Sequence, residues 1–120
     1  MNLDALVEYL DAFLRVREIP DYPNALNGLQ VSSPGQVDRI AVAVDASERS
    51  IGEAIRRGCS LLIVHHGLFW SGAQPVTGRM YRKLRACLEG GLAVYSAHIP
   101  LDVHPQVGNN IVLAREIGLD

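Results

Sequence analysis

The sequence predicts an α/β fold in which a mixed, mainly parallel β-sheet is flanked by helices, giving a three-layer α/β/α arrangement. Two apolar runs, 61–64 and 92–96, have the length and composition of strands that are buried on both faces, as parallel strands are. These runs alternate with segments of helical periodicity, which is the order of βαβ crossovers. A chain of 120 residues fits one domain, so we expect residues 1–120 to form a single α/β domain.

The composition is that of an ordinary globular protein. Hydrophobic residues make up 48% of the chain, charged residues 20%, and the net charge is -2, so no basic excess indicates a nucleic-acid partner. No apolar stretch approaches the length of a membrane span, and the N-terminus lacks the pattern of a secretory signal, so we expect a cytoplasmic protein without a membrane partner. The two cysteines, Cys59 and Cys87, are expected to be reduced, buried residues.

The first elements follow from apolar spacing and from turn residues. Apolar side chains at helical spacing predict a helix over 3–17, with Asn2 as its N-cap. Two prolines make 19–24 a loop. Two adjacent strands are then expected, a short one over 29–31 and a clearer one over 39–44.

The central part of the chain leads into the second buried strand. Asp45 and Glu48 have the spacing of a reciprocal cap for a helix that ends near Arg57. The strand beginning at Leu61 ends in the adjacent histidines His65 and His66. This helix and this strand form the first predicted crossover.

The segment 67–78 is rich in glycine and polar residues, and a loop of this length is often functional, so we expect it to overhang the histidine pair. Its aromatic residues, Phe69 and Trp70, are expected in the core or at an interface. A third helix follows from Met80 to Leu88, and after a strand over 92–96 a last helix begins near 108–110.

Histidines follow both buried strands. All four histidines of the chain lie there: His65, His66, His98 and His104. Because parallel strands bring their carboxyl ends to one edge of a sheet, we expect these side chains to share a side. Asp45 and Asp102 are carboxylates at the same predicted edge, and imidazole with carboxylate suits zinc, iron or manganese.

Several arrangements of this cluster remain open. Successive residues of a strand point to opposite faces, so His65 and His66 cannot bind one ion unless the backbone bends there. Two ions, one on each imidazole and bridged by Asp102, would resolve the difficulty. The structural alternative is that the histidines bond to backbone and Asp102 caps a turn, although the adjacent pair with a second histidine–carboxylate cluster favours metal binding. His104 fits a loop residue equally well.

The chain also resembles a known family along most of its length. The matching segments are Asn27-Gly28-Leu29-Gln30-Val31, Val44-Asp45-Ala46, the run from Leu62 to Trp70, the run from Ala97 to His104, and Gly108-Asn109-Asn110. These segments are similar, in order, to the GTP cyclohydrolase I type 2-like family, also called NIF-three-like.

The resemblance implies a dinuclear metal site in an α/β protein that forms a homohexamer, a ring with the sites facing its interior. By this resemblance His65 and His66 match the paired metal ligands, Asp102 matches the carboxylate ligand, and His98 is a catalytic candidate that lies behind the ligands or faces the substrate. Family members are about twice as long, and their later half supplies a further histidine and a glutamate. No segment of the 120 residues matches that half.

Three functions are compatible with these residues. The first is a metal-dependent hydrolase, or its metal-binding half, that holds two divalent ions and acts on a nucleotide or related substrate. The second is a non-catalytic, metal-stabilised interaction or assembly module. The third is a mononuclear phosphoesterase with its ion on His65, His98 and Asp102.

Overall fold

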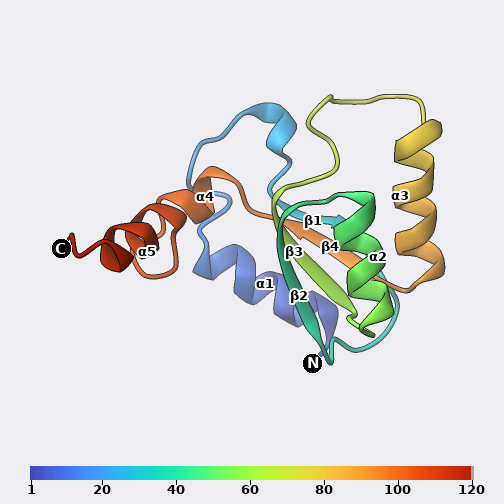
Figure 1. Ribbon diagram of the computed structural model, residues 1–120, viewed down its shortest axis with the longest axis horizontal. Coiled ribbons are helices and arrows are strands. Elements are labelled where there is room, and N and C mark those ends of the chain that lie inside the picture. Colours follow the sequence, from blue (N-terminus) through green and yellow to red (C-terminus); the bar gives the residue numbers. More distant parts are fainter. Residues whose placement is uncertain (120) are drawn as a thin grey trace.

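A computed structural model describes residues 1–119 of the chain. Within these residues a four-stranded sheet has the order β1-β4-β3-β2, with helices on both faces, which confirms the predicted α/β/α architecture (Figure 1). The elements in chain order are α1 (Leu3–Phe13), the short 3₁₀ helix η1 (Pro23–Ala25), β1 (Gly28–Val31), β2 (Ile40–Asp45), α2 (Glu48–Arg56), β3 (Leu61–His66), α3 (Gly78–Glu89), β4 (Ala93–Ser96), α4 (Ile99–Asp102) and α5 (Asn109–Glu116).

The sheet is mixed and mainly parallel, as the sequence predicts. β2, β3 and β4 are parallel neighbours, so their carboxyl ends meet at one edge. β1 runs antiparallel to β4, with Gly28 opposite Ser96. β1 and β2, which the sequence analysis expects to be adjacent, instead lie on opposite sides of the sheet, because β1 pairs with β4. The amino end of β1 thereby lies beside the carboxyl end of β4.

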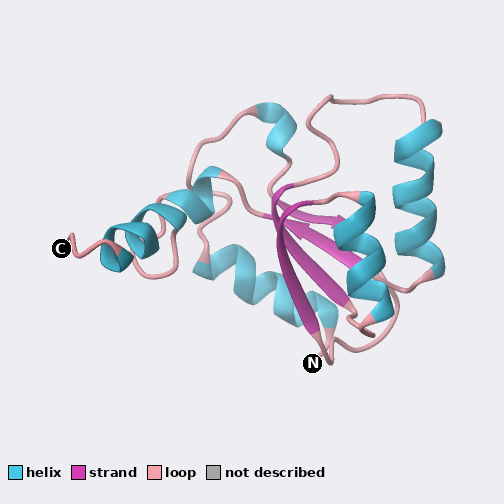
Figure 2. Ribbon diagram, in the orientation of Figure 1, coloured by secondary structure: helices cyan, strands magenta, loops and turns pink. Residues whose placement is uncertain are grey.

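The strands bury alternate residues in two separate cores, which is the pattern expected when helices cover both faces. Figure 2 shows the sheet between α1 on one side and the pair α2 and α3 on the other. The core under α1 includes Leu3, Leu6, Leu61, Ala93 and Tyr95. The core under α2 and α3 includes Ile51, Ala54, Leu62, Val64, Cys87 and Val94. All four residues of β4 are buried, which makes this strand the centre of the fold.

Three local expectations need correction. α1 ends at Phe13 instead of continuing to residue 17, because Arg15 has a left-handed backbone (φ 55°) that ends the helix. Asp45 does not cap α2: it ends β2, and Ser47 is the N-cap, in a reciprocal capping box with Ser50. The short helix α4 was not expected; Pro100 in its first turn is compatible with a helix start.

Cys59 and Cys87 are buried and unbridged, which confirms their predicted state. Burial raises the pKa of the Cys87 thiol, so it behaves as a small apolar side chain. None of the helices within residues 1–119 combines the length and apolar character needed to cross a membrane.

One buried polar contact joins β4 to α1. The Tyr95 hydroxyl donates to Asp11 Oδ1 at 2.8 Å, and Arg17 lies 3.5 Å from the same carboxylate. Burial, together with the nearby Asp11 carboxylate, raises the pKa of Tyr95, so the phenol remains a donor at any working pH. The contact fixes the position of α1 beneath the sheet.

We expect Tyr95→Phe to lower the free energy of unfolding by about 1–3 kcal/mol, because the ring still packs but Asp11 loses a buried donor. Urea unfolding followed by circular dichroism would measure the change. Tyr9→Phe, which alters a 60% exposed tyrosine on α1, is the matched control and should leave stability unchanged. Equal stability of Tyr95→Phe and the wild-type protein would contradict the assigned role.

Candidate metal centre

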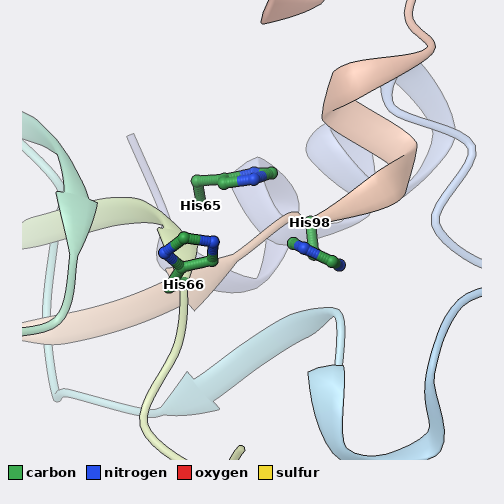
Figure 3. Close-up of side chains that lie close together, drawn as sticks. All are labelled: His65, His66 and His98. Carbon is green, nitrogen blue, oxygen red and sulfur yellow. The ribbon is translucent and has the colours of Figure 1, made fainter.

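Three imidazoles meet at the carboxyl edge of the sheet. His65 and His66 end β3, and His98 follows β4 (Figure 3). Ring centroids are 4.5 Å apart for His65 and His66, 4.7 Å for His65 and His98, and 5.6 Å for His66 and His98. One ring nitrogen from each lies within 4.8 Å of the other two, close enough for the three to serve a common centre. The parallel pairing of β3 and β4 produces this convergence.

The Nδ1 atoms of the histidine pair are held by oxygens on either side of β3. His65 Nδ1 lies 3.2 Å from the carbonyl oxygen of Ala97, and His66 Nδ1 lies 2.7 Å from Asp45 Oδ1. Because both partners are acceptors, each Nδ1 carries the proton, which leaves the Nε2 lone pair free. A purely structural role, in which the histidines bond to backbone, therefore explains only the Nδ1 atom of His65 and not its Nε2 atom.

Asp21 holds the third imidazole. His98 Nδ1 donates to its carboxylate, with distances of 3.0 and 3.2 Å to the two oxygens. The same carboxylate accepts hydrogen bonds from Asn27 Nδ2 at 2.9 Å, Ile99 N at 2.8 Å and Tyr22 N at 2.7 Å. Burial would raise the pKa of Asp21, but these hydrogen bonds outweigh it and lower the pKa. An ionised carboxylate fixes the tautomer of His98, so its Nε2 is also free.

Asp102 joins the cluster from α4. Its Oδ2 lies 3.7 Å from His65 Nε2, and Asn109 Nδ2 donates to its Oδ1 at 2.8 Å. The Asp102 side chain is 29% exposed, and that of His65 is 15% exposed. The carboxylate therefore faces the His65 nitrogen that is not hydrogen-bonded within residues 1–119.

The structure thus brings together the four predicted site residues, His65, His66, His98 and Asp102. The rings of His65 and His66 converge although the two residues are consecutive in β3. Alternation along the strand therefore does not by itself require one ion on each imidazole. His98 lies close enough to His65 and His66 to serve as a third ligand of the same centre.

His104 lies outside the cluster and has a structural role. It is 7% exposed; its Nε2 donates to the carbonyl oxygen of Phe13 at 3.0 Å, and its Nδ1 accepts from Gln106 N at 3.2 Å and Val107 N at 3.3 Å. Both nitrogens are therefore used, and the ring ties the end of α1 to the segment before α5. His104 could have been a member of the metal cluster or a loop residue, and the structure supports the second interpretation.

Sequence reasoning missed the side chains that position the cluster. Gln30 Oε1 accepts from Leu68 N at 2.7 Å, and its Nε2 donates to the carbonyl oxygens of Ala25 and Leu26 at 3.2 and 3.1 Å. A Cβ at Gly67 would overlap the end of the Gln30 side chain, so a larger residue there would displace Gln30 from these hydrogen bonds. Gln30 thus fixes the turn after the histidine pair. The one sequence signal for Gln30 is its position in the segment 27–31, which resembles the family.

The loop after β3 overhangs the cluster, as predicted, but its two aromatic residues differ. Phe69 packs against the core under α2 and α3. Trp70 is not a core residue: its ring centroid lies 4.6 Å from that of His98 and 5.9 Å from that of His66. It lines a pocket of about 520 Å³ beside the cluster. Trp70 therefore does not occupy the expected core position, and an interface position stays a prediction.

The fold and the cluster together define an α/β protein with a histidine–carboxylate centre at the carboxyl edge of its sheet. Residues 1–120 match the family Duf34/NIF3 (NGG1p interacting factor 3), and the chain belongs to this family. The resemblance found in the sequence is thereby confirmed.

Relatives and solved structures agree with this assignment. Proteins described as GTP cyclohydrolase 1 type 2 homolog share 44% identity over 97% of this chain in Deinococcus radiodurans and 46% over 99% in Treponema pallidum. The crystal structure of TTHA1606 from Thermus thermophilus superposes on the whole chain with a TM-score of 0.95 and 48% identity. The chain spans only 43%, 42% and 49% of the lengths of these three proteins.

We expect His104→Ala to lower the free energy of unfolding by about 1–3 kcal/mol, because the three backbone groups that its ring satisfies lose their partner. Chemical denaturation would measure this change. The variant should leave the geometry of the other three histidines intact, and their imidazole NMR signals would show this. Unchanged stability would show that His104 does not tie α1 to the following segment.

Proposed function

We propose that the cluster of His65, His66, His98 and Asp102 binds divalent metal ions, and that the chain is a metal-dependent hydrolase or the metal-binding half of one. The observation that carries the proposal is the state of the three imidazoles. Each Nδ1 is hydrogen-bonded to a protein oxygen, so each Nε2 is left as a ligand atom. Metal-binding histidines characteristically have such partners on their other nitrogen.

The donor set fits zinc, iron or manganese, which accept imidazole and carboxylate ligands. We favour two ions, with His65 and His66 as ligands and Asp102 close enough to His65 to share or bridge them. His98 would complete the imidazole set, in addition to the substrate-facing role that the sequence suggested. Four side chains leave coordination positions open, and in longer family members the later half would contribute further ligands by resemblance.

A divalent ion held by these residues would supply Lewis acidity and a water molecule that ionises near neutral pH. The residues of the chain would perform the remaining tasks. Asp21 and Asp45 orient His98 and His66, and the partly exposed cluster admits substrate from the pocket beside Trp70. A nucleotide or related compound is the substrate class we favour, in keeping with the description of the relatives as cyclohydrolase homologues.

A specific observation also favours the second candidate, a metal-stabilised assembly module. Apolar side chains on β2 are exposed, with Val42 at 78% and Val44 at 62%, close to the edge where Asp45 meets His66. Exposed apolar patches of this kind are common at protein interfaces. Assembly into a hexameric ring, and a cytoplasmic location, stay predictions.

Elemental analysis of protein purified without a histidine tag tests metal binding. We expect bound zinc, iron or manganese in the wild-type chain, and loss of most of it in His65→Ala and Asp102→Ala. His104→Ala and Asp38→Asn are the matched controls: the first removes a histidine outside the cluster, and the second neutralises an exposed carboxylate. Equal, negligible metal in all variants would rule out the proposal.

The two candidates differ in what metal removal does. The hydrolase should turn over a nucleotide or phosphoester substrate, and turnover should vanish in His65→Ala. The module should instead change its mass in light scattering when a chelator is added, without turning over any substrate. The pair of measurements therefore separates catalysis from assembly.

We expect Asp21→Asn to weaken metal affinity roughly 10- to 100-fold, because His98 loses the charged acceptor that fixes its tautomer. Competition with a chromogenic chelator would measure the affinity, and a thermal melt would verify folding. The exposed Asp38→Asn is again the control. An affinity equal to that of the wild-type protein would show that Asp21 does not act through His98.

A further inference from the structure

The pocket beside the cluster has features that metal binding does not explain. It measures about 520 Å³ and is lined by Tyr22, Asp45, His66, Trp70 and His98. This size lies within the range of small-molecule sites. Because two of the lining residues are proposed metal ligands, the pocket opens directly onto the proposed centre. Any compound held in it would lie beside the ions.

The side chains around the pocket offer aromatic surface to the solvent. Tyr22 is 66% exposed, and its ring centroid lies 6.4 Å from that of His98. Trp70 stands nearly perpendicular to the His98 ring, at 81°. Exposed aromatic faces gain most from a flat, apolar partner that stacks on them. The pocket is therefore suited to a planar ring.

A carboxylate adds polar recognition to this aromatic surface. The Asp45 side chain is 65% exposed and accepts one hydrogen bond, from His66 Nδ1. A carboxylate has about four acceptor positions, so Asp45 can accept further hydrogen bonds from a ligand. Ring N–H groups and exocyclic amino groups are the donors that a planar compound could present to it.

The aromatic wall is also anchored to the metal cluster. The backbone N–H of Tyr22 donates to Asp21 Oδ1 at 2.7 Å, and Asp21 is the carboxylate that holds His98. On the other side, Gln30 holds Leu68, two residues before Trp70. The pocket is thus built by the same contacts that position the imidazoles, which reduces the cost of ordering it when a ligand binds.

We propose that this pocket binds a planar nitrogen heterocycle, stacked against Tyr22 and Trp70 with its N–H edge toward Asp45. The inference rests on the proposed function and extends it by naming the part of the substrate that is recognised and the residues that recognise it. A sugar phosphate or another polar group attached to the ring would then extend toward the histidine cluster.

Trp70 is the single tryptophan of the 120 residues, so its fluorescence reports directly on the pocket. Zinc-loaded protein would be titrated with guanosine monophosphate, and in parallel with ribose 5-phosphate, which lacks the heterocycle. We expect saturable quenching by the nucleotide only, with calorimetry as an independent measure of binding. Absence of nucleotide binding, or equal binding of ribose 5-phosphate, would overturn the proposal.

Variants then test which side chains form the pocket. Tyr22→Ala should raise the dissociation constant for guanosine monophosphate roughly tenfold, since stacking of a base on an aromatic side chain is lost. Tyr9→Ala removes a similarly exposed tyrosine that does not line the pocket and should bind like wild type. Unchanged affinity in Tyr22→Ala would exclude stacking on this wall.

Metal content measured on the same samples separates this proposal from the proposed function. Bound zinc without nucleotide binding would reject the heterocycle pocket and leave the metal centre intact. Nucleotide binding that depends on Tyr22 in protein that takes up no zinc would support the pocket and reject the metal centre.

Discussion

The hydrogen bonds that hold the Nδ1 atoms of three imidazoles are the interactions on which the site depends. An imidazole that is free to rotate would have no preferred ligand nitrogen. Three such rings would not keep their nitrogens directed at a common centre. Oxygen acceptors from Ala97, Asp45 and Asp21 remove that freedom. The parallel strands bring Asp45, Ala97 and the rings to one edge, and Asp21 reaches it from the loop after α1. The fold and the chemistry of the site are therefore linked through these contacts.

Much of the fold could be predicted because its strongest determinant, continuous apolar sequence, is local. The runs that become β3 and β4 are buried on both faces, and that burial shows directly in their composition. Strand pairing is different, since β1 pairs with β4, which follows more than sixty residues later. Nothing local in 28–31 distinguishes this partner from the nearer β2. Capping was similarly ambiguous, because Asp45 and Ser47 both precede α2 and only geometry selects Ser47.

The residues of the site likewise fall into those that local sequence could predict and those that it could not. His65, His66 and Asp102 could be assigned to one edge because the histidine pair ends β3 and Asp102 comes shortly after the end of β4. Asp21 and Gln30 could not, because they act on residues that are distant in sequence. A hydrogen bond from a loop side chain leaves no periodic pattern, and only the folded chain shows what it holds. The sequence also could not decide between a core position and a pocket wall for Trp70, since a large aromatic residue in an apolar run is compatible with both.

The complete burial of the segment after β4 has a further consequence. Ala97 has no exposed surface and provides the carbonyl that orients His65, while Ser96 before it is equally buried. A larger side chain at either position would disturb interior packing and ligand orientation together. Substitutions at Ser96 and Ala97 must therefore satisfy two demands at once. Most solvent-facing positions of α5 are subject to neither demand; Asn109, which donates to Asp102, is the exception.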